Sequence, residues 1–162
     1  MPLELVDLRR GGASRYSWVP PFDFETAYEN ERWWDDVPYL FDDPWYVQVL
    51  EEGAEVTRVE LDHPGGINPE YADVPQLGPE RLEVQLIEVA STARGRGVGT
   101  RVVRALQERH TDRRLFAYSE DAHGFWASLG WERFDHPEGE QYHQPLFIQP
   151  RASAAWRKPR SV

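Results

Sequence analysis

The residues of this chain best suited to chemistry form the stretch Arg94-Gly95-Arg96-Gly97-Val98-Gly99-Thr100. Its three glycines occupy alternate positions between a strand-like run over 82–90 and a helix-like run over 98–110. Glycines leave backbone N–H groups uncovered, and the first turn of a helix adds free N–H groups and the positive end of its dipole. Such a loop binds phosphate or pyrophosphate. The sequence therefore predicts a phosphate-binding site whose ligand must be identified from the residues around it.

Two kinds of nucleotide-binding loop fit this stretch poorly. A nucleoside-triphosphate loop ends in Gly-Lys-Ser/Thr, whereas this one ends in Gly-Val-Gly-Thr without a lysine. A dinucleotide-binding loop that starts at Gly95 requires glycine at the sixth position, where Thr100 stands. Only 62 residues follow Thr100, too few for the rest of a dinucleotide-binding domain. Neither nucleotide class is favoured.

Two motifs together resemble a third class. Arg94-x-x-Gly97-x-Gly99 is similar to the Arg/Gln-x-x-Gly-x-Gly/Ala signature of the GNAT superfamily of acyl-CoA N-acyltransferases. Residues 122–131 resemble the later Ala-x-x-Phe-Tyr-x-x-x-Gly-Phe segment of that superfamily. The resemblance covers 82–131, extends by element order alone to 45–61 and 132–149, and says little about 1–44. It implies acetyl-CoA as cofactor and N-acetyl transfer to a primary amine as activity.

The order of elements agrees with an α/β fold of the α+β type. We predict strands at 3–8, 45–50, 56–61, 82–90, 114–118, 131–134 and 146–149, and helices at 24–34, 98–110 and 122–129. The resemblance implies a mixed, mostly antiparallel sheet of six to seven strands flanked by helices, splayed between 82–90 and 114–118. Residues 1–150 are expected to be one domain, and 151–162 a basic tail. The loop over 63–80 is long enough to act as a lid.

The resemblance also implies where the cofactor binds. The pyrophosphate would contact the backbone of 94–100, and the pantetheine arm would pair with the edge of the strand over 82–90. The implied cofactor-binding residues are Val89, Ala90, Arg94, Gly95, Arg96, Gly97, Val98, Gly99, Thr100, Phe125 and Trp126. The alternative is a glycine-rich turn that only allows the helix to pack closely on the strand.

Direct transfer to an amine requires a base, a group that polarises the thioester carbonyl, and a proton for the leaving thiolate. Glu83 is the first candidate base, because some GNAT enzymes carry a glutamate at this position, eleven residues before Arg94. Glu88 is the second. In a regular strand the two lie on opposite faces, so both can face the substrate only across a β-bulge. The alternative for Glu83 and for Glu88 is a solvated or salt-bridged strand residue without a catalytic role. A backbone N–H near Val89 is expected to polarise the carbonyl.

The proton donor is where the sequence departs from the family pattern. Trp126 stands where the family often has a tyrosine, and an indole N–H is no proton source at neutral pH. Tyr118, Tyr142 or water is expected to protonate the thiolate instead. The departure keeps open a second hypothesis, an acyl-CoA-binding module with weak or no catalysis that acts through partner binding. A third is a partner-binding protein assembled through a sheet edge or the tail.

The first 80 residues are acidic and aromatic, which suits a cationic acceptor. They hold 18 Asp and Glu against 5 Arg, while the whole chain has a net charge of −10. Carboxylates beside aromatic rings attract an ammonium group. The expected acceptor-binding residues are Trp33, Trp34, Asp35, Asp36 and Asp42. The alternative is that the aromatic rings are core and the acids their solvated rim.

Composition sets the remaining expectations. The negative charge argues against nucleic acid as the partner, and favours a small-molecule or peptide amine; a homodimer is possible. The chain has no cysteine, no signal-like N-terminus and no apolar run of membrane-spanning length, so a cytoplasmic protein without membrane contact is expected. His136 and His143, with Glu138 and Glu140, are interpreted as a solvated turn, and no metal site is expected.

Overall fold

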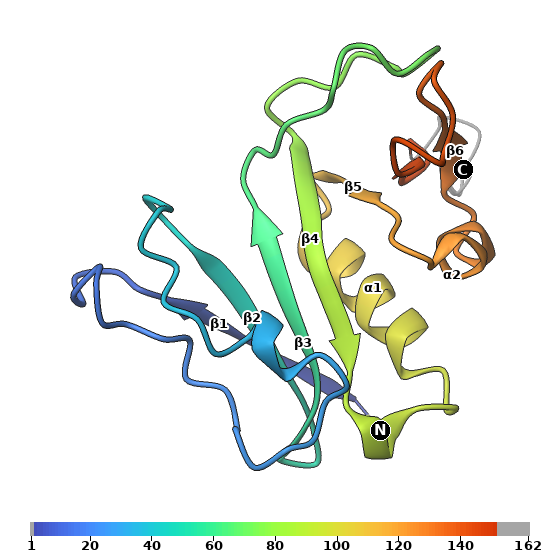
Figure 1. The fold of residues 1–162 in the computed structure, drawn as a ribbon. Helices are drawn as coiled ribbons and strands as arrows, with labels where there is room; N and C mark the ends of the chain where they lie inside the picture. Colours follow the sequence, from blue (N-terminus) through green and yellow to red (C-terminus); the bar gives the residue numbers. More distant parts are fainter. Residues whose placement is uncertain (1, 152–162) are drawn as a thin grey trace, which may run out of the picture.

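The computed structural model describes residues 2–151, so the predicted basic tail lies outside the described residues from 152 onward. Seven strands form one sheet in the order β1-β2-β3-β4-β5-β7-β6 (Figure 1). All neighbouring pairs are antiparallel except β4 and β5. The strands are β1 (Leu3–Arg9), β2 (Trp45–Glu51), β3 (Ala54–Asp62), β4 (Arg81–Val89), β5 (Arg114–Tyr118), β6 (Glu132–Phe134) and β7 (Leu146–Ile148). The predicted fold class is confirmed.

Two helices cover one face of the sheet. In α1 (Val98–Arg109) the large apolar residues recur at helical spacing and are buried: Val98, Val102, Val103 and Leu106. The short α2 (His123–Ser128) lies on the same side, where Trp126 joins the core cluster formed by α1 and the sheet. No helix within 2–151 is long and apolar enough to cross a membrane.

The other face is covered by irregular segments instead of helices (Figure 1). The helix predicted over 24–34 is wrong, because only the 3-10 helix η1 (Glu31–Trp33) forms there. The buried aromatic residues of this segment are Phe22, Tyr28 and Trp34, six residues apart, which does not match helical periodicity. Loop 63–80 covers the same face farther along, where Tyr71 packs with Phe116 and Leu146.

A buried ion pair attaches the first irregular segment to the sheet. Arg58 Nε donates to Glu55 Oε2 over 2.8 Å, and the two side chains are 2% and 0% exposed. Glu55 also accepts from the Tyr28 hydroxyl and the Asp23 N–H. The Arg58 guanidinium lies 4.0 Å from the centre of the Tyr28 ring. A buried charge this well paired is costly to leave without its partner.

We predict that Glu55→Ala lowers the free energy of unfolding by about 3–5 kcal/mol, because it leaves the Arg58 charge buried and unpaired. Urea denaturation measures the change. Asp42→Ala is the matched control, since Asp42 pairs with Arg15 but its side chain is 95% exposed. Equal effects of the two substitutions would contradict the assignment.

Candidate active site

The sheet opens between β4 and β5. The two strands pair only over 81–83 and 114–116, although β4 continues to Val89 and β5 to Tyr118. Beyond Glu83, no strand of the described chain pairs with the β5-facing edge of β4. The predicted splay is confirmed, and it leaves a row of backbone N–H and C=O groups available to a ligand.

A β-bulge at Gln85 determines what β4 presents to each face. Glu60 of β3 pairs with Leu86 and Leu61 pairs with Val84, so Gln85 has no partner in the ladder. The extra residue reverses the alternation of side chains. As a result Glu83 lies on the same face as Leu86 and Glu88, opposite α1. The bulge that would bring both glutamates to one face is therefore present.

The opening contains an elongated cavity of about 400 Å³. One wall is β4 from Glu83 to Val89, and the opposite wall is formed by Tyr118, Ala122, Phe125 and Trp126. Trp33 closes a further side. At Val89 and Gly99 this cavity meets a second, more open one of about 790 Å³, which is lined by residues of the glycine loop. The two cavities form a continuous channel from the loop to Glu83.

The glycine loop has the geometry of an anion site. Gly97 precedes α1 with φ of 71°, a left-handed conformation that glycine adopts without strain, and no side chain caps the helix there. The first N–H groups of α1 are therefore available to a phosphate. The nearby guanidinium groups carry partners: Arg94 pairs with Glu29, and Arg96 and Arg101 pair with Glu51. These pairs are partly exposed and exchange readily.

The carboxyl group of Glu83 lies at the far end of the channel. Its residue is 8% exposed and has no side-chain hydrogen bond or ion pair within residues 2–151. Burial, together with the negative charges of Asp62 and Glu60, raises the pKa of Glu83 to about 7. A carboxyl group that titrates near neutral pH is suited to general base catalysis.

Tyr118 lines the same cavity as Glu83. Its hydroxyl accepts a hydrogen bond from the Asn68 N–H over 2.9 Å, which leaves the phenolic proton free to be donated. Burial and the charge of Glu83 raise the pKa of Tyr118. The other candidate acid, Tyr142, is 72% exposed and does not line the cavity.

The sequence profile of the acetyltransferase (GNAT) family matches residues 14–131. The chain belongs to the GNAT family. A search of curated protein sequences gives no significant match.

Solved structures share the GNAT fold at low identity. An acetyltransferase from Thermus thermophilus is 15% identical with a TM-score of 0.50, and the match covers 66% of this chain and 64% of that one. AAC(6')-Ib in complex with ribostamycin and coenzyme A is 19% identical with a TM-score of 0.50, covering 73% and 69%. AtaT complexed with acetyl-methionyl-tRNAfMet is 12% identical with a TM-score of 0.58, covering 92% and 95%.

The prediction of a small-molecule or peptide amine as partner, with nucleic acid excluded, is wrong. AtaT, which shares the fold over 92% of this chain, holds an acetylated aminoacyl-tRNA. The exclusion depended on the net charge of −10. Total charge describes the average field of a protein, whereas recognition of one end of a large molecule depends on the local groove.

The residues of this GNAT channel fit an acyl-CoA. The free edge of β4 can pair with the amides of a pantetheine arm, and the start of α1 can hold the pyrophosphate. Gly99 allows close passage at the junction, because a Cβ there would lie 3.2 Å from the Phe125 ring. Most of the predicted cofactor residues line the two cavities. Ala90 and Arg96 do not, and the Ala90 N–H donates to the Val56 carbonyl.

Glu88 lies on the correct face but its carboxylate is fully engaged. It accepts hydrogen bonds from the backbone and side-chain amides of Asn30 and from the indole N–H of Trp34, all within 3.0 Å. A guanidinium nitrogen of Arg94 lies 3.6 Å from Glu88 Oε2. Glu88 therefore attaches the segment that carries Trp33 to β4, and it offers no free oxygen to an amine.

The predicted acceptor residues are not brought together. Trp33 lines the cofactor channel, while Trp34 is buried against Glu88. Asp36 and Asp42 line two adjacent grooves, which share Phe41, Glu60 and Gln85, and Asp35 lines neither. Asp42 is also paired with Arg15.

The side chains of the histidine turn, residues 136–143, contact other residues of the protein. The ligand atoms of His136, Glu138 and His143 lie within 4.8 Å of one another. However, both ring nitrogens of His136 are engaged, one with Glu70 and one with the Glu138 N–H. The rings of His136 and His143 stack at 3.6 Å and 17°, so their in-plane lone pairs do not converge on one point.

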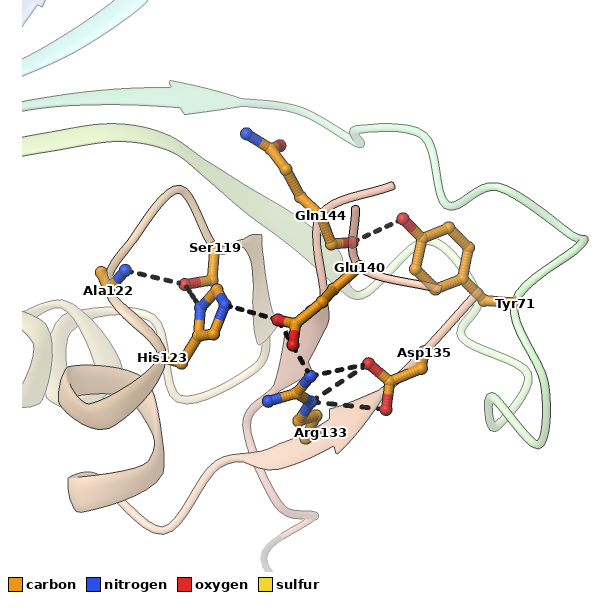
Figure 2. A network of polar contacts seen from close by, with 8 residues as sticks. All are labelled: Tyr71, Ser119, Ala122, His123, Arg133, Asp135, Glu140 and Gln144. Atoms are coloured by element: carbon orange, nitrogen blue, oxygen red, sulfur yellow. Dashed lines mark hydrogen bonds and ion pairs between the residues drawn. The ribbon is translucent and has the colours of Figure 1, made fainter. Parts of the chain in front are cut away.

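Sequence reasoning missed Gln85 and Gln144, which both line the cavity near Glu83. Gln144 comes from the loop before β7. Figure 2 shows its side chain pointing away from Tyr71, whose hydroxyl donates to the Gln144 carbonyl over 2.6 Å. The same loop is attached to α2, because Glu140 contacts His123 over 3.1 Å (Figure 2). Nothing in the spacing of residues 136–145 indicates this placement.

Loop 63–80 contacts three residues at the Glu83 end of the channel. Asn68 donates to Tyr118, Tyr71 donates to Gln144, and Gly65 packs against Glu83. A Cβ on Gly65 would lie 2.7 Å from the Glu83 Cβ, and the residue has φ of +78°. Only glycine fits this position without moving the glutamate.

We predict that Gly65→Ala lowers kcat by about 100-fold, because a displacement of about 1 Å at a catalytic group has an effect of this size. Acetyl-CoA affinity should not change, since Gly65 is remote from the glycine loop. Gly66→Ala is the matched control, because a Cβ at Gly66 meets no atom within 4 Å. The same kcat for both variants would show that loop 63–80 does not position Glu83. Steady-state thiol release measures both.

Proposed function

We propose that this GNAT protein transfers an acetyl group directly from acetyl-CoA to a primary amine, with Glu83 as the general base. One observation supports this most strongly: a buried carboxyl group without a partner lies where β4 and β5 part, at the end of a channel that begins at the glycine loop. Bound acetyl-CoA would supply an activated thioester at this point.

The chemistry balances with groups of this chain. The amine nitrogen bonds to the acetyl carbonyl carbon, the carbon–sulfur bond breaks, and one amine proton passes to Glu83 directly or through a water. A free N–H of the β4 edge near the bulge polarises the carbonyl, in place of the N–H expected near Val89, which lies where the channel meets the cavity of the glycine loop. Tyr118 donates its proton to the departing sulfur. Trp126 then serves as a wall of the channel, and Glu88 as the residue that positions Trp33.

The pKa of the base favours one kind of amine. A carboxyl group with a pKa of about 7 is matched to an α-amine, whose pKa is about 7.7–8.0, better than to a lysine side chain, at about 10.4. We therefore propose the α-amine of an aminoacyl-tRNA as the acceptor. The AtaT complex with acetyl-methionyl-tRNAfMet, which matches in fold over 92% of this chain, supports this class. A cytoplasmic location is part of the same proposal.

A binding module with weak catalysis is the second candidate, favoured by the tryptophan at 126. It makes a different prediction for turnover: acetyl-CoA would bind, and no aminoacyl-tRNA, protein or amine would accept the acetyl group. The two experiments below separate the candidates.

We predict that kcat rises with pH through an inflection at about 7, because Glu83 must be ionised to accept a proton and its pKa is about 7. The rate should level off only above about 8, where the α-amine is also neutral. Glu83→Gln should lower kcat by about 10²–10⁴-fold and remove this inflection. The dissociation constant of acetyl-CoA, measured by calorimetry, should stay the same. An unchanged rate with an unchanged inflection would exclude Glu83 as the base.

We predict that acetyl label from radioactive acetyl-CoA enters the aminoacyl-tRNA fraction of a charged total-tRNA preparation. Mild alkaline hydrolysis of the aminoacyl ester should release the label from the tRNA, and uncharged tRNA should not become labelled. Label that enters only protein N-termini or only free amines would overturn the proposed acceptor while leaving the transferase assignment in place.

A further inference from the structure

Three carboxyl groups gather on the face of the sheet opposite α1. Asp62 of β3 lies directly across the ladder from Glu83 of β4, and Glu60 lies two residues earlier on β3. Side chains directly opposite in an antiparallel pair have Cβ atoms about 4.5–5.5 Å apart, and like charges there are destabilising. The arrangement therefore works against the stability of the fold.

No basic group of residues 2–151 makes an ion pair or hydrogen bond with Glu60, Asp62 or Glu83. The arginines nearest in sequence are engaged elsewhere, since Arg58 pairs with Glu55 and Arg81 donates to the carbonyls of Gly65 and Gly78. Two further arginines contact residues that line the grooves. Arg9 pairs with Asp43, and Arg10 donates to the backbone carbonyls of Pro38, Phe41 and Asp42. Burial, with Asp62 nearby, raises the pKa of Glu60 to about 7, as for Glu83. A buried or partly buried carboxyl group without a partner lowers the stability of the fold, and a positively charged ligand would offset that loss.

Glu60 and Asp62 line two grooves that adjoin the Glu83 end of the channel. Gln85, at the bulge, lines the cavity of about 400 Å³ between β4 and β5 and also both grooves. The first groove, of about 570 Å³, contains Glu60 with the aromatic rings of Tyr39, Phe41 and Tyr46. The second, of about 310 Å³, contains Glu60 and Asp62. An acceptor that places its amine at Glu83 must extend past Gln85 into one of them.

We propose that these grooves bind the cationic side chain of the aminoacyl group, so that the acceptor is a lysyl- or arginyl-tRNA. The inference rests on the proposed function and adds the identity of the amino acid. Strand spacing places the backbones of Glu60 and Glu83 roughly 8 Å apart, a gap that the long stem of lysine or arginine can bridge. Phe41 and Glu60 line both grooves, so in either one an aromatic ring can cover the apolar stem and a carboxylate can receive the charge, with Asp62 as a second carboxylate in the second groove.

The test compares purified tRNAs charged with lysine, arginine, methionine and glycine, at pH 8, where Glu83 is ionised. We expect kcat/KM for the lysyl and arginyl forms to exceed that for the methionyl form by about tenfold or more, which corresponds to about 1.4 kcal/mol. The double substitution Glu60→Gln and Asp62→Asn should remove this preference, so that the lysyl and methionyl rates become equal. The ratio of the two rates is the readout, because loss of the two charges also lowers the pKa of Glu83 and so changes both rates alike. Loss of like charges should not lower the thermal midpoint, which checks folding.

Asp43→Asn is the matched control, because Asp43 lines the second groove but is already neutralised by Arg9. The Asp43→Asn variant should retain the preference for the lysyl and arginyl forms. Equal rates on all four aminoacyl-tRNAs, or a preference that survives the double substitution, would overturn the inference while the proposed function stands. No acetylation of any aminoacyl-tRNA would overturn both.

Discussion

The parting of β4 from β5 after Glu83 and Phe116 is the constraint on which the rest of this structure depends. A sheet that loses a strand neighbour in its middle leaves backbone groups without partners, and the fold must supply a ligand for them or close the gap. Here the gap stays open as a channel with the glycine loop at one end and Glu83 at the other. The same opening thus provides the proposed cofactor site and, in that proposal, determines where the acceptor arrives.

Irregular segments take the place of helices on the acceptor side, and buried charges hold them. Glu55 and Arg58 attach the segment over 22–28, whereas Glu88 attaches the segment over 30–34. In each case a carboxylate of a strand accepts from a backbone N–H that a longer helix could have satisfied internally, and from side-chain donors of the same segment. Loop 63–80 does the equivalent for the reaction end through hydrogen bonds to Tyr118 and Gln144. Glu60, Asp62 and Glu83 stand apart because nothing in the described chain pairs with them.

Most of the fold could be predicted from periodicity, and most of the acceptor side could not. Alternation and helical spacing located every strand and both helices, and two motifs indicated the cofactor. The bulge left one sequence signal that was overlooked: the adjacent apolar pair Leu86-Ile87 breaks the alternation begun by Leu82 and Val84. The position of Gln144 depends on contacts between segments far apart in the sequence, and so does the choice of partners for Glu88. A local sequence pattern cannot predict such contacts. Net charge, an average over the chain, misdirected the choice of partner.

A crystal structure with acetyl-CoA tests the central claim most directly. The account predicts pantetheine amides hydrogen-bonded to the β4 edge between Gln85 and Val89, pyrophosphate oxygens on the first N–H groups of α1, and the acetyl group beside Glu83 and Tyr118. A cofactor bound on another surface, or an acetyl group that points away from Glu83, would contradict it.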